Sequence, residues 1–486
     1  MIELVRGMRD MLPGDYAVQA AVAKDIEQVL ASYGYVPVDA PILERRELYL
    51  RKLGEELVGK IYEFSFHGRD LALRPEWTAS VLRSYVTRMQ AEPLPLRLRY
   101  TGPVFRNERP QRHTFRQFTQ LGVELIGGPS PRADAECLAL ACAGLDAVNV
   151  RDYRVRIGHI GLIRELLSAL GLSDRTQSFL AWSLERMRKN GAADIRAQLE
   201  ASEGEHSIID AELIAGLNDE QAEALLLHAL REIGVNLRFG TRPPEAIVGR
   251  LLRKLRRQDP RPQIERALAL LERLCVIQGP PASSLPQVEA LLAEFELPSN
   301  AITEIRAILQ LLDAHGVLAR CLELDFGLGR GLNYYTGLIF EIYDAEDVQL
   351  CGGGRYDDLV TTLGGRQATP AIGFAYGLER VVAAVKQHER PTARDVLVIA
   401  QNESSYPQAL SLAQRLRHQG WIVQLDVRGR SAALNLRDAE RRGISTALIV
   451  GTADGELLWR DLRTREERRL SLEEMVHTGF ELRSEE

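Results

Sequence analysis

The most informative part of the chain reads Phe105-Arg106-Asn107-Glu108-Arg109-Pro110-Gln111, followed by Phe115-Arg116-Gln117-Phe118-Thr119-Gln120-Leu121-Gly122-Val123-Glu124. Two alternating segments flank a short loop rich in arginine, which indicates two adjacent strands. Period-two alternation places Arg116, Gln120 and Glu124 on one face, with Gly122 leaving space between the last two. Guanidinium groups bind phosphate oxygens bidentately, whereas a glutamine and a glutamate suit an ammonium or an imidazole. A salt-bridged surface hairpin is the alternative interpretation.

Composition bounds the class of protein. At 486 residues the chain exceeds one ordinary core, and we expect two or three domains. A hydrophobic content of 45% and a charged content of 26% are typical of a soluble globular protein, and no segment resembles a membrane span. The net charge of −6 excludes a globally cationic surface, so a nucleic-acid partner would have to meet local basic patches. Five cysteines without CxxC spacing favour thiols in a reducing cytoplasm over disulfides or zinc. They are Cys137, Cys142, Cys275, Cys321 and Cys351.

Periodicity and turn residues divide the chain into regions. A helix is expected from Pro13 to Gly34, and strands with short loops dominate from about Ile61 to Leu125. From roughly Gly161 to Leu318 the sequence is almost entirely helical, and it reads as an insertion because strand-rich sequence resumes at Leu322. Its basic run indicates a solvated helix face more often than an RNA contact. That run comprises Arg250, Arg253, Lys254, Arg256 and Arg257.

A polar linker from His388 to Arg394 precedes a compact region that alternates strand and helix. This alternation predicts an α/β domain with a mostly parallel sheet. The expected strands are 396–400, 422–427 and 447–450, and the expected helices are 407–419 and 432–442.

Three further segments carry candidate chemistry. In Gly329-Arg330-Gly331-Leu332-Asn333-Tyr334-Tyr335-Thr336-Gly337, one arginine lies among glycines that let a ligand approach the backbone. Gly352-Gly353-Gly354-Arg355-Tyr356-Asp357 lacks the ending of a Walker loop, and a tight turn is the alternative for both segments. Ala371 to Ala384 contains an apolar helix with Arg380, which must meet an anion or pair with Glu379 or another carboxylate.

Together these segments resemble the class II aminoacyl-tRNA synthetases and, within them, the histidyl-tRNA synthetase family. The matching segments are Arg6–Pro13 for the opening, Gly34–Pro41 for motif 1, Phe105–Glu124 for motif 2, Gly373–Arg380 for motif 3, and Arg330–Thr336 with Gly353–Asp357 for the two histidine signatures. The resemblance implies an α/β and α+β multidomain fold. Its antiparallel-sheet catalytic core would span 1–160 and 319–388, a helical insertion domain 161–318, and an α/β anticodon-binding domain 395–486.

The same resemblance implies a cytoplasmic homodimer that activates L-histidine with ATP and transfers it to the 3′ end of tRNA(His). Mg²⁺ would arrive bound with ATP, because no side-chain cluster has metal-ligand spacing. Arg106 and Arg330 would act at the α-phosphate and the histidine carboxylate, Arg380 at the γ-phosphate, and Glu108 on the adenine side, with Arg116 also in the ATP site. The residues implied for histidine are Glu76, Thr78 and Gln120 at the ammonium, Glu124 and Tyr335 at the imidazole, and Trp77, Tyr334 and Tyr356 around it.

Three positions depart from the family pattern. Trp77 stands in place of glycine, Asn333 in place of aspartate, and His113-Thr114 in place of a Gly-Arg pair in the motif 2 loop. The alternative function is that of a silent paralogue, the histidine-binding regulatory subunit of ATP phosphoribosyltransferase. Such paralogues lose the ATP-binding parts of motifs 2 and 3 and lack the anticodon-binding domain. Because this chain keeps both, the ligase is the favoured interpretation.

Overall fold

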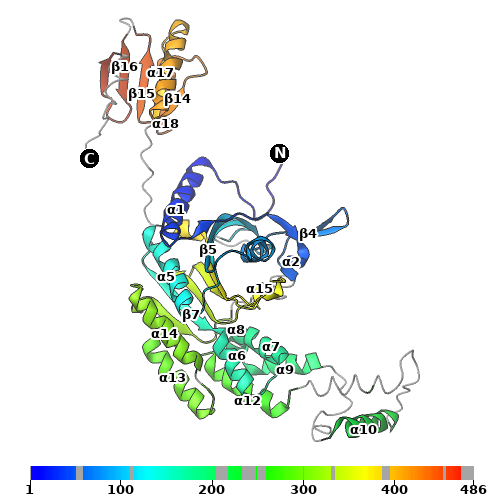
Figure 1. Cartoon of the computed structure of the whole chain (residues 1–486). Coiled ribbons are helices and arrows are strands. Elements are labelled where there is room, and N and C mark those ends of the chain that lie inside the picture. The colour runs from blue at the N-terminus through cyan, green and yellow to red at the C-terminus, as the bar shows by residue number, and fades with distance from the viewer. Residues whose placement is uncertain are drawn as a thin grey trace. The chain divides into compact units, whose positions relative to one another are not determined.

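The computed structural model describes residues 2–50, 59–109, 114–203, 217–232, 248, 259–298, 300–329, 334–385, 395–452 and 456–471. They form two compact units, Met1–Lys386 and Gln387–Glu486, which are treated separately below (Figure 1). Arg330, Asn333, His113 and the basic run of 250–257 lie outside the described residues.

The first unit is built on a sheet whose nine described strands follow the order β1-β5-β6-β12-β11-β10-β7-β9-β8. Their bounds are β1 Val36–Pro37, β5 Leu96–Phe105, β6 Gln117–Ile126, β7 Tyr153–His159, β8 Gln278–Gly279, β9 Leu322–Asp325, β10 Leu338–Asp344, β11 Gln349–Arg355 and β12 Ala371–Gly377. Every pairing from β5 through β7 is antiparallel, whereas β1 joins β5 and β9 joins β7 in parallel. The predicted antiparallel-sheet core is therefore confirmed.

Helices cover one face of this sheet. Three of them, α1 (Pro13–Ser32), α5 (Arg132–Ala147) and α16 (Leu378–Ala384), contact one another or the strands β6, β11 and β12 (Figure 1). On β6 the apolar residues Leu121, Val123 and Leu125 are buried in the core shared with these helices. Strand alternation then directs Gln120, Gly122 and Glu124 to the opposite face. The face predicted from the sequence is the one opposite α1, α5 and α16, where a second hydrophobic cluster packs on the sheet.

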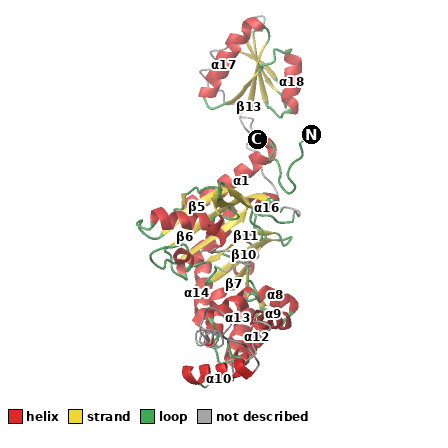
Figure 2. Ribbon diagram, turned by 90° about the vertical axis from the view of Figure 1, so that its right-hand side faces the viewer, coloured by secondary structure: helices red, strands yellow, loops and turns green. Residues whose placement is uncertain are grey.

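A run of helices separates β7 from β9 in the sequence and gathers at one end of the sheet (Figures 1 and 2). The described members are α6 Ile160–Ala169, α7 Asp174–Trp182, α8 Leu184–Asn190, α9 Ala192–Glu203, α10 Asp219–Glu232, α12 Arg261–Leu274, α13 Pro281–Glu294 and α14 Asn300–Ala314. The short strand β8 lies within this run and pairs with β9, and most of the helices share one hydrophobic core with the sheet. Whether the block is a separate domain stays a prediction.

Strands and loops dominate the segment from Ile61 to Leu125, as expected, and it also contains a helix. A small sheet of β2 (Leu43–Arg45), β3 (Glu63–Phe66) and β4 (Arg69–Leu73) leads into α4 (Thr78–Ser84), which continues as a π-helical turn over Tyr85–Met89. The sequence does not predict this helix, because it spans only seven residues, too few for helical periodicity to be recognised.

The second unit is a five-stranded sheet in the order β14-β13-β15-β16-β17, with α17 and α18 on opposite faces (Figure 2). The bounds are β13 Asp395–Ala400, α17 Tyr406–His418, β14 Ile422–Leu425, α18 Ala432–Arg441, β15 Thr446–Val450, β16 Leu457–Asp461 and β17 Glu467–Leu470. The predicted α/β class is confirmed. The expectation of a mostly parallel sheet is wrong, because β16 and β17 add two antiparallel pairings to the two parallel ones.

In the part of the chain that the structure describes, no helix has both the length and the apolar character that crossing a membrane requires. All five cysteines are buried free thiols.

Candidate active site

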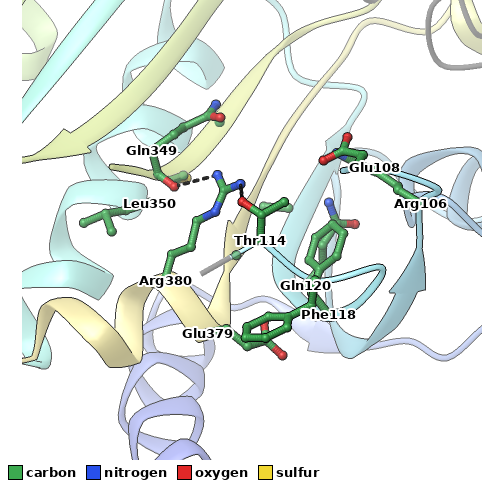
Figure 3. A pocket seen from close by; sticks show the side chains of 14 residues that line it. Arg106, Glu108, Thr114, Phe118, Gln120, Gln349, Leu350, Glu379 and Arg380 are labelled. Atoms are coloured by element: carbon green, nitrogen blue, oxygen red, sulfur yellow. Dashed lines mark hydrogen bonds between the residues drawn. The ribbon is translucent and has the colours of Figure 1, made fainter. Parts of the chain in front are cut away.

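A pocket of about 200 Å³ opens at the end of the β5–β6 hairpin (Figure 3). Three elements supply its walls: the hairpin, the start of β11, and the junction of β12 with α16. Its lining residues are Arg106, Glu108, Thr114, Phe115, Phe118, Gln120, Gln349, Leu350, Cys351, Gly352, Ala375, Gly377, Glu379 and Arg380. Four residues predicted for the site, Arg106, Glu108, Gln120 and Arg380, are thus brought together from distant parts of the sequence.

Arg106 and Glu108 follow directly after β5. The Arg106 Nε donates to the Pro75 carbonyl at 2.8 Å, and its guanidinium carbon lies 5.2 Å from the centre of the Phe118 ring. The Glu108 carboxylate lies 3.7 Å from Lys60 Nζ. This geometry is not that of a surface hairpin held by its own salt bridges, because both side chains line the pocket.

Arg380 enters the pocket from α16 on the other side (Figure 3). Its guanidinium donates to the Gln349 carbonyl at 3.1 Å and to the Thr114 hydroxyl at 3.3 Å. The neighbouring Glu379 accepts the Thr119 N–H on both carboxylate oxygens, at 2.9 and 3.0 Å. Arg380 is therefore not held by Glu379, and its hydrogen-bond partners within the described ranges are neutral. A cation held in this way is suited to an anionic ligand.

Small residues form the floor of the site. In the strand register Gly122 of β6 pairs with Ala375 of β12, which pairs with Gly352 of β11. In the next row Glu124 pairs with Gly373, and a Cβ at Gly373 would lie 2.0 Å from Glu124 Oε2. Glycine is required there because the buried carboxylate occupies the space above the backbone.

Glu124 lies beneath the pocket and is fully buried. Its Oε1 accepts the Tyr100 hydroxyl at 3.2 Å, and Tyr100 pairs with Gly122 across the β5–β6 ladder. Burial, and secondarily the Glu124 charge, raise the pKa of Tyr100 well above its usual range, so the phenol stays protonated and donates. The space expected at Gly122 is partly filled, because a Cβ there would lie 2.8 Å from Tyr100 Oη.

Aromatic side chains surround this carboxylate. Trp77 stacks on Tyr100 with ring centres 4.9 Å apart and an interplanar angle of 10°. Tyr334, Tyr335 and Tyr356 form an adjoining group, with Tyr334 centred 4.6 Å from Tyr335 and 5.8 Å from Tyr356. All of them belong to, or pack against, one hydrophobic cluster on this face of the sheet.

The residues predicted for an α-ammonium group lie near the start of α4 and on β6. The buried Glu76 accepts the Ala79 N–H at 3.0 Å, which fixes its carboxylate at the helix start, and Thr78 is the first residue of that helix. Within the described residues, two buried oxygens on this face have no hydrogen-bond partner, Gln120 Oε1 and Tyr356 Oη. Such atoms are suited to a polar ligand.

Arg116 lies outside the pocket lining. Its guanidinium donates to the carbonyls of Glu108 and Arg6, both at 3.2 Å, and its side chain packs against Gly7. Its assignment to ATP stays a prediction, while the structure assigns it a contact with the N-terminal segment.

Sequence reasoning missed Tyr100 and the contribution of β11. Gln349 to Gly352 line the pocket beside β12, and Phe115 and Phe118 supply its aromatic wall. Alternation places Tyr100 and Gly102 of β5 on one face, but only the strand register shows that Tyr100 lies opposite Gly122.

Comparisons with known proteins agree with this geometry. The model of the family "Histidyl-tRNA synthetase" matches residues 7–235 and 249–381. The chain belongs to the histidyl-tRNA synthetase family. This membership makes it an enzyme of the histidine–tRNA ligase class. A second family model, "Anticodon binding domain", matches residues 395–478.

Relatives match over their full length. A Methanocaldococcus jannaschii protein named histidine–tRNA ligase is 30% identical, and the alignment covers 98% of this chain and 99% of that one. One of the same name from Pyrococcus furiosus is 31% identical, with 98% of both chains covered.

Solved structures support the fold. The histidyl-tRNA synthetase of Nostoc sp. PCC 7120 aligns with a TM-score of 0.66 at 21% identity, covering 98% of both chains. A Bacillus halodurans protein described as an ATP phosphoribosyltransferase regulatory subunit/histidyl-tRNA synthetase aligns with a TM-score of 0.65 at 23% identity, covering 93% of this chain and 99% of that one. Since the fold occurs under both descriptions, the fold alone does not separate the two functions.

Proposed function

We propose that the chain activates L-histidine with ATP and transfers the histidyl group to the 3′ end of tRNA(His). The observation that carries the proposal is the single pocket in which Arg106, Glu108 and Arg380 meet Gln120, above the buried Glu124. Phosphate-binding cations and groups suited to an amino acid therefore share one face of one sheet.

In the first step the histidine carboxylate attacks the α-phosphorus of ATP, the bond to the β-phosphate oxygen breaks, and pyrophosphate leaves. Negative charge grows on the phosphoryl oxygens, and Arg106 is placed to stabilise it. Arg330, outside the described residues, is proposed as the second arginine at this phosphate. Arg380 would bind the γ-phosphate and Glu108 the adenine side.

Recognition of the amino acid is assigned to the same face. Glu76, Thr78 and Gln120 would bind the ammonium group, and Glu124 with Tyr335 would bind the imidazole. In the second step the terminal ribose hydroxyl of tRNA attacks the carbonyl carbon of the adenylate, and AMP leaves.

Mg²⁺ would supply positive charge at the phosphates. No group of three or more His, Cys, Asp or Glu side chains could hold a metal ion in the ranges that the structure covers. The ion would therefore enter with ATP, beside the lining carboxylates Glu108 and Glu379.

A homodimer and a cytoplasmic location belong to the same proposal. The region resembling motif 1 contains the short edge strand β1, and exposed apolar side chains nearby include Val36, Ile42 and Leu43. An edge of this kind is usually covered. Light scattering at micromolar concentration should give about twice 54.4 kDa, and a mass near 54.4 kDa would count against the dimer. The five buried thiols are in keeping with a reducing compartment.

Histidine-dependent exchange between ATP and labelled pyrophosphate tests the activity most directly, with histidine omitted as the control. Charging of tRNA(His) should follow. Histidine binding without exchange, together with stimulation of an ATP phosphoribosyltransferase catalytic subunit, would support the regulatory alternative. The match of residues 395–478 to an anticodon-binding model favours the ligase.

A further inference from the structure

Four buried side chains contact one another in turn: Arg74, Trp77, Tyr100 and Glu124. We propose that Trp77 and Tyr100 are positioning residues, which together hold the Glu124 carboxylate in place for the side chain of the bound amino acid. The inference deepens the proposed function and rests on its assignment of Glu124 to the substrate.

The first link is the fixed position of Trp77. The guanidinium carbon of Arg74 lies 3.6 Å from the centre of the indole ring, on a side chain that also donates to the carbonyls of Pro103 at 2.8 Å and Ala40 at 2.7 Å. The indole Nε1 donates to the Gly102 carbonyl at 3.3 Å. Trp77 is only 1% exposed. A ring with one face against a cation, an engaged N–H and no solvent around it has a single orientation.

The backbone of β5 is adapted to this ring. A Cβ at Gly102 would lie 2.7 Å from Cζ2 of Trp77, so only glycine leaves room for the indole. Gly102 pairs with Gln120 across the hairpin, which puts Trp77 next to the strand that carries both Gln120 and Glu124.

The second link joins Trp77 to Tyr100. The two rings are nearly parallel, at 10°, with centres 4.9 Å apart. This stack fixes the direction of the phenol. The glycine opposite, Gly122, leaves space for the hydroxyl, which points along the sheet toward Glu124.

The third link is the hydrogen bond from Tyr100 Oη to Glu124 Oε1 at 3.2 Å. The Phe374 carbonyl lies 3.5 Å from the same hydroxyl, and the carboxylate is both nearer and the stronger acceptor. One carboxylate oxygen is therefore held by the phenol. Since a buried carboxylate must accept hydrogen bonds, a substrate side chain with an N–H group satisfies this site, whereas an apolar one does not.

Two substitutions separate the links. Tyr100→Phe keeps the ring and the stack and removes only the hydroxyl, whereas Trp77→Leu removes the stack. Trp77→Phe is the conservative variant, because it retains an aromatic ring against Tyr100. Tyr153→Phe is a matched control, since it deletes a buried phenol that donates to the Asp146 carboxylate at 3.4 Å in the same unit.

The measurement is calorimetric binding of L-histidine and of a non-hydrolysable ATP analogue to the full chain. Tyr100→Phe and Trp77→Leu should each weaken histidine binding by about 10-fold or more, the loss typical of a hydrogen bond to a charged group. The double variant should bind histidine no more than about threefold more weakly than the weaker-binding single variant. Both changes disrupt the same positioning of the Glu124 carboxylate, so their effects should not multiply. Trp77→Phe should weaken histidine binding less than Trp77→Leu does, Tyr153→Phe should stay near wild type, and the ATP analogue should bind all variants alike.

If the two losses of histidine affinity multiply in the double variant, the proposal is overturned in favour of a general packing role. A parallel loss of ATP-analogue binding would have the same meaning. If Trp77→Leu does not fold, unchanged histidine affinity in Tyr100→Phe still overturns it. Wild-type protein that binds histidine without pyrophosphate exchange would refute only the ligase. Wild-type protein that binds no histidine would refute both inferences.

Discussion

Replacing Arg380 by glutamine tests the nucleotide half of the site. The side chain lies in the pocket and is held by two neutral acceptors, the Gln349 carbonyl and the Thr114 hydroxyl. If the Arg380 side chain binds the γ-phosphate, Arg380→Gln should weaken ATP binding and leave histidine binding unchanged. Glu124, the carboxylate assigned to histidine, is buried elsewhere, in strand β6.

The magnitude follows from the kind of contact. A hydrogen bond to a charged group contributes about 1.5–3 kcal/mol, which corresponds to roughly 10- to 150-fold in the ATP KM at about 1.4 kcal/mol per tenfold. Thr114→Val is the graded control, since it removes one of the two hydrogen bonds that hold the Arg380 guanidinium and keeps its charge, and it should raise the ATP KM by about 10-fold or less.

Steady-state pyrophosphate exchange, with each substrate varied at saturation of the other, separates the two constants. An unchanged ATP KM in Arg380→Gln would show that the γ-phosphate lies elsewhere. An equal increase in both KM values would indicate that the pocket has collapsed. The ATP KM of Thr114→Val would then not lie between those of the wild type and Arg380→Gln.

Three further changes probe other parts of the molecule. Glu124→Gln should lower kcat/KM for histidine about 10²-fold with the ATP KM unchanged, as expected when a buried charged acceptor is lost; equal loss for both substrates would contradict this. Arg330→Ala should form adenylate at least ~10²-fold more slowly in a single turnover while binding histidine normally by calorimetry, and a wild-type rate would remove Arg330 from the chemical step. Burial lowers the pKa of His159 below its usual ~6.5. The Nδ1 atom of this ring accepts the Leu162 N–H at 2.9 Å, which requires the neutral form. As the pH falls, the unfolded chain therefore takes up a proton at His159 before the folded chain does. Stability of the first unit should therefore fall as the pH drops below about 6.5, and urea titrations at pH 7.5 and 5.5 should show a smaller fall for His159→Gln.

The sequence predicts one half of this site better than the other. Alternation in 117–124 correctly separated the residues that pack against α1 and α5 from Gln120, Gly122 and Glu124 on the opposite face, because successive side chains of a strand point to opposite faces. It could not predict Tyr100 as the partner of Glu124, since that contact depends on the register between β5 and β6. The arrival of Gln349 to Gly352 at the pocket likewise depends on the position of β11 beside β12.

The same reasoning explains the misjudged sheet of the second unit. Two strands alternating with two helices, followed by a third strand, predict parallel pairing because each crossover returns the chain in the same direction. β15 ends at Val450 and the next strand begins at Leu457, and so short a connection reverses the chain. β16 and β17 therefore add to the sheet edge as antiparallel strands.

Strand β6 connects the stability of the fold to the chemistry of the site. Its apolar residues Leu121 and Val123 are fully buried against the helices, while Gln120 and Glu124, which flank them in the sequence, lie on the opposite face. A slip of one residue in its pairing would bury the polar pair in the hydrophobic core and expose the apolar set, which the free energy of folding opposes strongly. The hydrophobic packing of one face therefore fixes the positions of the recognition groups on the other. On that face the hydrogen bond from Tyr100 of β5 to Glu124 of β6 ties the position of the carboxylate to the same strand register.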